Sequence, residues 1–276
     1  MKKYIVFGGC RISYRTLGTG SPVMLLHGFG EDSTIWDAQV TFLQDKYFLI
    51  IPDLPGTRES DLLKKDNVSL IDYAEVIKAI LVAEKISVVT MIGHSMGGYI
   101  TLAFAEKYPE MLKAFGLVHS GAYADDEEKI KTRKKSIAFI KEHGSGAFLQ
   151  TAVPGLFLDQ DKNKEDIDLL IAKGSTTSPE ALIQYYTAMI ERPDRTSVLK
   201  SFPEPILFII GEHDKAIPFK HSLQQSHLPA HAYINILRKS AHMGMKEEAE
   251  KTNVIVLGFI KGGYNNFFLD YSKIII

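Results

Sequence analysis

The chain has 276 residues, with 32 lysines and arginines against 33 aspartates and glutamates, for a formal net charge of −1. Without an excess of basic charge, nucleic acid is not an expected partner. The single cysteine, Cys10, excludes an internal disulfide and fits a reducing, cytoplasmic location. No apolar run is long enough to span a membrane, and the apolar start of the chain is too short for a secretion signal.

Strand and helix patterns alternate along most of the chain. A hairpin that turns near Gly8-Gly9 comes first. The patterns that follow are strand 22–26, helix 34–45, strand 47–52, helix 69–84, strand 87–92, helix 97–107 and strand 114–118, and later strand 205–210, helix 218–227, strand 232–237 and helix 245–260. The alternation predicts an α/β fold, with a mostly parallel central sheet and helices on both faces.

The segment between strand 114–118 and strand 205–210 has a different pattern. It contains no buried-strand run and predicts four helices, at 125–143, 146–157, 163–173 and 179–190. Since core strands occur on both sides, we expect a helical insertion at 123–200 into a core formed by 1–122 and 201–276. The charge run 125–135 is interpreted as a solvated helix face, and 191–195 as a connection whose charges pair at the surface.

A serine stands at the corner between a strand and a helix. The stretch Gly93-His94-Ser95-Met96-Gly97-Gly98 joins strand 87–92 to helix 97–107. Glycines two residues to either side of the serine suit a turn too tight for larger side chains. This is the G-x-S-x-G nucleophile elbow in its strand-turn-helix setting, so Ser95 is the candidate nucleophile.

Candidate partners of the serine follow later strands. Asp214 lies in the polar turn after strand 205–210, and His242 lies after strand 232–237. Their order after the serine is the one that an elbow of this kind requires. Before the elbow, His27-Gly28-Phe29-Gly30 follows strand 22–26, and such a loop can aim a backbone N–H at a substrate carbonyl oxygen.

Taken together, these motifs resemble those of serine hydrolases of the α/β-hydrolase superfamily. The matching stretches are His27 to Gly30, Asp53-Leu54-Pro55-Gly56, Gly93 to Gly98, Gly211-Glu212-His213-Asp214 and His242. The resemblance implies a catalytic triad of Ser95, Asp214 and His242. It also implies an oxyanion hole formed by the amides of Phe29 and Met96, supported by His27, Gly28, Gly93, His94 and Gly97.

The resemblance also covers the helical insertion and contains one departure. Residues 123–200 resemble the cap that covers the pocket in many relatives. Relatives often continue the second motif as D-x-P-G-x-G-x-S, whereas Arg58 replaces the second glycine here. The expected backbone path of that loop, and one wall of the pocket, are therefore open questions. Some relatives place the acid after the strand before the cap, but Val118-His119-Ser120-Gly121 offers no carboxylate.

The predicted activity is hydrolysis of a small to medium carboxylic ester, thioester or lactone through an acyl-enzyme, without a metal or organic cofactor. Carbon–carbon bond hydrolysis or perhydrolysis on the same triad is the alternative, and a ligand-binding receptor of the same fold is a further one. The remaining histidines, His119 among them, are interpreted as surface or packing residues. The expected partner is a small-molecule substrate, for a monomer or homodimer. The apolar tail 264–276 is expected to pack on its own domain.

Overall fold

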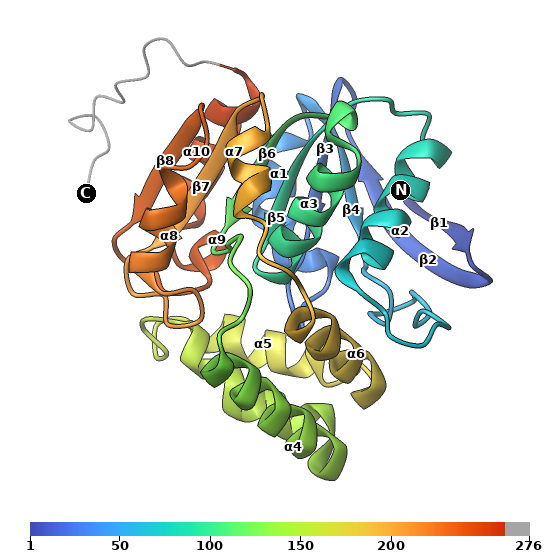
Figure 1. The fold of residues 1–276 in the computed structure, drawn as a ribbon, viewed down its shortest axis with the longest axis vertical. Helices are drawn as coiled ribbons and strands as arrows, with labels where there is room; N and C mark the ends of the chain where they lie inside the picture. The colour runs from blue at the N-terminus through green and yellow to red at the C-terminus, as the bar shows by residue number, and fades with distance from the viewer. Residues whose placement is uncertain (263–276) are drawn as a thin grey trace.

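The structure is a computed structural model that describes residues 1–262. Its centre is an eight-stranded sheet with the order β1-β2-β4-β3-β5-β6-β7-β8. The strands are β1 (Lys2–Phe7), β2 (Cys10–Leu17), β3 (Ser21–Leu26), β4 (Tyr47–Pro52), β5 (Val89–His94), β6 (Leu112–Val118), β7 (Ile206–Gly211) and β8 (Ala232–Leu237). β2 pairs antiparallel with β1 and β4, and the other neighbouring strands are parallel. The predicted α/β fold with a mostly parallel sheet is therefore confirmed (Figure 1).

Helices cover both faces of this sheet, as the alternating pattern predicted. They are α1 (Asp37–Leu43), α2 (Leu70–Ala83), α3 (Met96–Lys107), α8 (Phe219–Ser226), α9 (Gly244–Glu247) and α10 (Ala249–Ile260), with short 3₁₀ turns at Ser33–Trp36 and Pro109–Met111. α2 packs against α3 on one face, and α1 packs against α10 on the other (Figure 1). Every residue of β5 and β7 is buried as a result, which explains their largely apolar sequences.

The segment between β6 and β7 is helical. It contains α4 (Glu127–Ala152), a 3₁₀ turn (Pro154–Leu156), α5 (Lys164–Gly174), α6 (Pro179–Ile190) and α7 (Thr196–Ser201). α4 spans the first two predicted helices, which meet at Gly144 with φ 80° and ψ 173°. α4, α5 and α6 lie together below the sheet in Figure 1. α7 lies in a stretch for which the sequence predicted no helix.

Of two sequence interpretations of charged residues in this segment, one is wrong and the other holds only in part. Arg192 and Arg195 were expected at the surface, but they are only 8% and 4% exposed. Arg192 pairs with Asp125 at 2.9 Å, and Arg195 pairs with Glu106 at 3.0 Å. The charge run 125–135 is not a purely solvated face either, since Asp125 is buried and its Oδ2 lies 2.6 Å from the Arg133 Nε. Opposite charges on separate segments neutralise one another, which makes burial possible.

The predicted packing of the tail 264–276 lies outside the described residues. Among the helices of residues 1–262, none combines the length and apolar character needed to cross a membrane.

The turn between β5 and α3 is held by close backbone contacts. Ser95 has φ 49° and ψ −115°, a backbone conformation that residues other than glycine rarely adopt. Such a conformation persists only where the surrounding structure imposes it. A Cβ on Gly93 would lie 2.3 Å from the Gly97 carbonyl oxygen, and one on Gly97 would lie 2.5 Å from the Leu26 carbonyl oxygen. The glycines are therefore required by the backbone itself.

We predict that Gly93→Ala lowers the free energy of unfolding by about 1–3 kcal/mol, since the added methyl group meets backbone that cannot rotate away. Urea denaturation measures this change. Gly258→Ala is the matched control: a Cβ there meets nothing within 4 Å, and the position lies inside α10. Alanine at that position should stabilise the protein by about 0.5–1 kcal/mol. Equal effects of the two substitutions would contradict the steric argument.

Candidate active site

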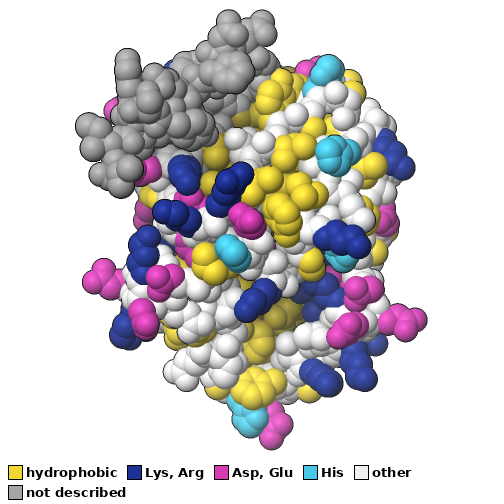
Figure 2. Space-filling view, turned by 90° about the vertical axis from the view of Figure 1, so that its left-hand side faces the viewer, with side chains coloured by type: hydrophobic (Ala, Val, Ile, Leu, Met, Phe, Trp, Pro, Cys, Tyr) yellow, Lys and Arg dark blue, Asp and Glu magenta, His cyan; other side chains and the backbone are white. Residues whose placement is uncertain are grey.

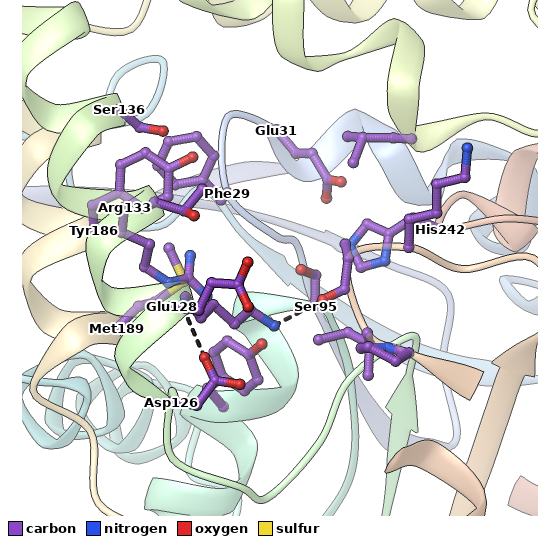
Figure 3. Close-up of a pocket in the computed structure, with 18 residues that line it drawn as sticks. Phe29, Glu31, Ser95, Asp126, Glu128, Arg133, Ser136, Tyr186, Met189 and His242 are labelled. Carbon is purple, nitrogen blue, oxygen red and sulfur yellow. Dashed lines mark hydrogen bonds between the residues drawn. The ribbon is translucent and has the colours of Figure 1, made fainter. Parts of the chain in front are cut away.

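The three predicted catalytic side chains lie at the ends of parallel strands. Ser95 follows β5, Asp214 follows β7 and His242 follows β8. The His242 Nδ1 lies 2.8 Å from the Asp214 Oδ2, so the structure brings this pair into direct contact. Ser95 and His242 line the same cavity (Figure 3). Within the described chain, the Ser95 hydroxyl makes no hydrogen bond to the His242 ring, a contact that often tightens only when substrate binds.

Asp214 is held in place by four contacts. The backbone N–H groups of Ala216 and Ile217 donate to its Oδ1 at 2.8 and 2.9 Å. The His242 Nδ1 forms a hydrogen bond with its Oδ2, and the His119 Nδ1 lies 3.5 Å from the same oxygen. Burial would raise the pKa of Asp214, but the His242 ring, its hydrogen bond to the carboxylate and the nearby His119 ring outweigh it and hold the pKa far below its usual range. Asp214 is therefore ionised, and its orientation is fixed.

His119 was expected at the surface or in packing, yet it contacts the candidate acid. Its ring is buried, and its Nε2 accepts a hydrogen bond from the Gly244 N–H at 3.1 Å. The proton of the neutral ring must then be on Nδ1, which faces Asp214. Burial lowers the pKa of His119 to about 4, so the ring is neutral at pH 7. His119 adds a weak second N–H contact to Asp214 without adding charge.

His242 experiences opposing effects. Burial disfavours the charged imidazolium, but the Asp214 carboxylate beside it favours that form more strongly, and the Glu31 carboxylate adds to it. The pKa of His242 is raised as a result. A ring so placed is a stronger base than a free histidine, while Asp214 holds its Nδ1 and leaves Nε2 for a reacting proton.

The serine and the candidate oxyanion loop are close neighbours. A Cβ built on Gly28 would lie 3.1 Å from the Ser95 Cβ. The Ser95 N–H donates to the Val118 carbonyl at 2.9 Å, and the Ser120 hydroxyl donates to the Ser95 carbonyl at 2.7 Å. Met96 is the first residue of α3, so its N–H has no acceptor within the helix. Phe29 lies on the cavity wall, its ring stacked on Tyr186 with centroids 4.2 Å apart.

A buried carboxylate links this loop to the other parts of the site. The Glu31 Oε2 accepts the Gly28 N–H at 2.6 Å and lies 3.0 Å from the His94 Nδ1. The other ring nitrogen of His94 lies 3.0 Å from the His242 carbonyl oxygen, which can only accept. His94 therefore donates from Nε2. The pKa of Glu31 is lowered because His94 and the Gly28 N–H outweigh its burial. The sequence alone gave no reason to select Glu31.

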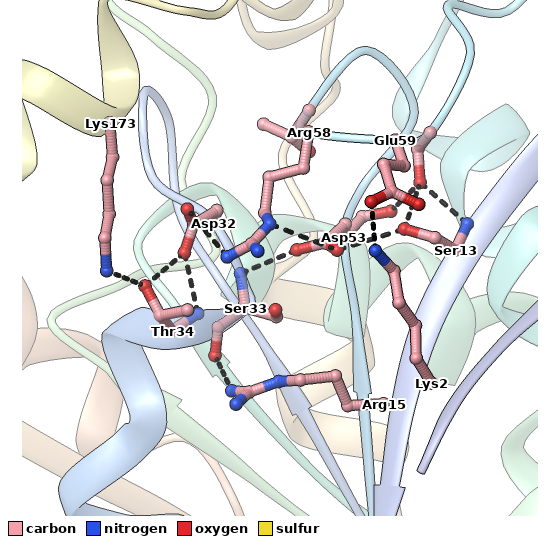
Figure 4. Close-up of polar contacts among 12 residues, drawn as sticks. Lys2, Ser13, Arg15, Asp32, Ser33, Thr34, Asp53, Arg58, Glu59 and Lys173 are labelled. Carbon is pink, nitrogen blue, oxygen red and sulfur yellow. Dashed lines mark hydrogen bonds and ion pairs between the residues drawn. The ribbon is translucent and has the colours of Figure 1, made fainter.

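Arg58 has a backbone conformation that glycine adopts more readily than other residues. Arg58 has φ 50°, in the left-handed region, and its guanidinium contacts Asp32 at 3.4 Å and Asp53 at 3.9 Å (Figure 4). Asp53 also accepts from Ser33 N–H and Ser13 hydroxyl, each at 3.0 Å. His27 faces the same loop, where its Nε2 accepts the Leu54 N–H at 2.9 Å. Arg58 is not among the residues that line the cavity.

The cavity lies between the sheet and the helical segment. Its volume is about 450 Å³. Figure 2 shows a hollow with hydrophobic side chains inside it and charged side chains at its rim. Phe29, Leu156, Tyr186, Met189 and Ile217 give the cavity an apolar lining, and Asp126, Glu128 and Lys215 are its exposed charged residues. Several hydrogen bonds tie the helical segment to the core; among them, the Tyr185 hydroxyl donates to the Pro55 carbonyl at 2.6 Å, and the His242 N–H donates to the Leu156 carbonyl at 2.9 Å.

Among residues 1–262, one group of side chains has the spacing needed to hold a metal ion. The ligand atoms of His119, Asp214 and His242 lie within 4.8 Å of one another, and all three residues are buried. Their hydrogen bonds already account for this cluster. His242 Nδ1 and Asp214 Oδ2 bind each other, and His119 Nε2 accepts from Gly244. The arrangement is therefore explained without a cation.

Comparisons with known proteins place this geometry in a family. A family model described as the alpha/beta hydrolase fold matches residues 21–249. An esterase from Thermogutta terrifontis, solved with malate bound, has a TM-score of 0.89 at 25% identity, covering 96% of this chain and 100% of that one. An enol-lactonase from Burkholderia xenovorans has a TM-score of 0.87 at 20% identity, covering 94% and 100%. The enol-lactonase supports the fold alone.

Two curated relatives match over similar lengths. A 2-hydroxy-6-oxo-6-phenylhexa-2,4-dienoate hydrolase from Comamonas testosteroni is 23% identical over 91% of this chain and 91% of its own. A 2-hydroxy-6-oxononadienedioate/2-hydroxy-6-oxononatrienedioate hydrolase from Burkholderia vietnamiensis is 26% identical over the same shares. The family model covers most of the sequence, from the strand before the His27 loop to the start of the last helix. The chain belongs to the α/β hydrolase fold family.

Proposed function

We propose that this protein is a serine hydrolase of small to medium carboxylic esters, including thioesters or lactones, with Ser95, His242 and Asp214 as its triad. The contact that carries the proposal is the buried His242–Asp214 hydrogen bond at 2.8 Å, beside a strained serine that faces the same cavity. A structural histidine would need neither the buried acid nor the cavity. The combination is that of an activated nucleophile and its base.

The proposed reaction begins at Ser95. Its Oγ attacks the carbonyl carbon while the His242 Nε2 takes the hydroxyl proton, and the carbonyl electron pair moves to oxygen. The N–H groups of Phe29 and Met96 bind this oxyanion. As the tetrahedral intermediate collapses, the bond to the leaving group breaks and His242 returns the proton to it. Water then attacks the acyl-enzyme in the same way and releases the acid.

The surroundings account for how these groups are held. Asp214 fixes the His242 tautomer and stabilises the imidazolium, and the His119 ring lies against the same Asp214 oxygen. Glu31 and His94 hold the oxyanion loop and the His242 backbone together. In this proposal residues 123–200 form a cap on a core of 1–122 and 201–276. The cavity of about 450 Å³ fits a small to medium molecule rather than a polymer.

A second reaction is favoured by the two curated relatives. Their names describe 6-oxo dienoates, in which the carbonyl group at carbon 6 is a ketone rather than an ester. Hydrolysis at such a ketone breaks a carbon–carbon bond. The same triad serves both reactions, so the choice depends on the cavity. A panel of esters, thioesters, lactones and 6-oxo dienoates separates the two. Turnover of dienoates with inert esters would replace the ester proposal by this alternative.

We predict that Ser95→Ala abolishes hydrolysis of p-nitrophenyl acetate and butyrate, with a loss of kcat on the order of 10⁴- to 10⁶-fold. Asp214→Asn should lower kcat by about 10⁴-fold, because the His242 tautomer is no longer fixed. Initial rates followed at 405 nm, together with circular dichroism of each variant, check the prediction. A folded Ser95→Ala variant with wild-type rates would remove Ser95 from the mechanism.

The pH profile provides a separate prediction. His242 must be neutral to act as a base, and its raised pKa sets the acid limb of kcat/KM above the ordinary histidine value of about 6.5. Glu31 contributes to that rise, so Glu31→Gln should move the limb to lower pH. The exposed Glu59→Gln variant is the control, and its limb should stay in place. A Glu31→Gln limb that does not move, or moves upward, would contradict the assigned electrostatic role.

A further inference from the structure

A buried tyrosine in the cavity lacks a partner for its hydroxyl. Tyr99 lies on α3, one helical turn after Ser95, and is only 3% exposed. It lines the same cavity as Ser95 and His242. Among the described residues, none forms a hydrogen bond with its hydroxyl, although buried phenols usually have one. The hydroxyl is not fully enclosed by protein, so its partner is water or a molecule bound in the cavity.

Cationic side chains surround this tyrosine. The Arg192 guanidinium lies 4.0 Å from the centre of its ring. Lys129 and Arg133 line the same cavity, and Figure 3 shows Arg133 in its wall. Burial would raise the pKa of Tyr99, but the charges of Arg192, Lys129 and Arg133 outweigh it and lower the pKa. The region around the hydroxyl is therefore electropositive.

The carboxylates nearby do not neutralise this charge. Asp125 is the one that contacts the arginines, and it is shared between Arg133 at 2.6 Å and Arg192 at 2.9 Å. Lys129 donates to the Ala216 carbonyl at 2.8 Å, a neutral acceptor. Asp126 and Glu128 lie at the exposed rim, where water screens them. One buried carboxylate thus faces three cations.

Glu31 also lines the cavity, but it is already paired. Its Oε2 is bound by His94 and the Gly28 N–H, so it does not compensate the cations around Tyr99. The cavity therefore has separate regions, an apolar wall with Phe29 and Met189 and a cationic region around Tyr99. A substrate with an anionic end and an apolar middle matches both.

We propose that Tyr99, Lys129 and Arg133 form a subsite for a carboxylate group on the substrate, so that the preferred esters carry a free carboxylate at the far end of a short acyl chain. The inference rests on the proposed hydrolase function and names its substrate class. Arg133 already uses Nε and Nη2 on Asp125, which leaves Nη1 for the ligand. The Tyr99 hydroxyl and the Lys129 ammonium supply the other donors.

A pair of esters of equal chain length tests the subsite. Mono-p-nitrophenyl glutarate carries the carboxylate, and p-nitrophenyl valerate does not. We expect kcat/KM to be higher for the glutarate by about tenfold or more, because hydrogen bonds to a charged group are stronger than hydrogen bonds between neutral groups. Tyr99→Phe and Lys129→Met should each reduce that ratio by about fivefold or more. The exposed Lys134→Met on the same helix removes an equal charge outside the cavity and should leave the ratio unchanged.

Binding of a non-ester separates this inference from the hydrolase proposal. Glutaramate keeps the carboxylate and replaces the ester by an amide, and valeramide lacks the charge. Calorimetry should show glutaramate binding about tenfold more tightly than valeramide, with the difference reduced in Tyr99→Phe. Equal affinities, or a preference unaffected by Tyr99→Phe and Lys129→Met, would overturn the subsite. Tyr99-dependent glutaramate binding without hydrolysis of any ester would instead overturn the hydrolase proposal alone.

Discussion

The arrangement of the site depends on the buried contact between Glu31 and His94. The Glu31 carboxylate binds the Gly28 N–H of the candidate oxyanion loop, and His94 precedes the proposed nucleophile and donates to the His242 carbonyl. Through His94, this contact joins the loop after β3, the end of β5 and the loop after β8. Removing His94 would leave the ionised Glu31 carboxylate buried without this partner, at a cost of about 3–5 kcal/mol, so the contact helps to fix the three segments relative to one another. The general position of His242 relative to Ser95 depends in part on this contact.

The parts of the site that the sequence predicted are those determined by local backbone. Gly93 and Gly97 can be recognised in the sequence because the elbow has no room for a Cβ at either position. The strands can be recognised as apolar runs because both faces of the sheet are covered. Ser95, Asp214 and His242 each follow such a strand, so their order along the chain carries the prediction. The eight strands of the sheet could be predicted from the sequence for the same reason.

The residues that sequence reasoning missed act through distant contacts. His119 follows β6 with φ 47°, and only the folded chain shows its ring between Gly244 and Asp214. Arg192 reads as part of a polar connection, whereas it is buried against Asp125 and Tyr99. Neither case has a local pattern, because the partners lie far apart in sequence: Asp214 and Gly244 follow β7 and β8, and Asp125 lies 67 residues before Arg192. A buried charge is predictable only when its counter-charge is known.

Arg58 shows how a departure from a family pattern can leave the reaction centre unaffected. A non-glycine residue in the left-handed region costs roughly 1–2 kcal/mol, and the chain accepts this cost with φ 50° at the position where relatives have glycine. The guanidinium offsets part of it by facing two carboxylates, Asp32 and Asp53, that are themselves almost fully buried. Since Arg58 does not line the cavity, its effect is on the stability of the Asp53 loop. The substitution changes which group stabilises that loop, while the cavity wall is set by Phe29 and the helical segment.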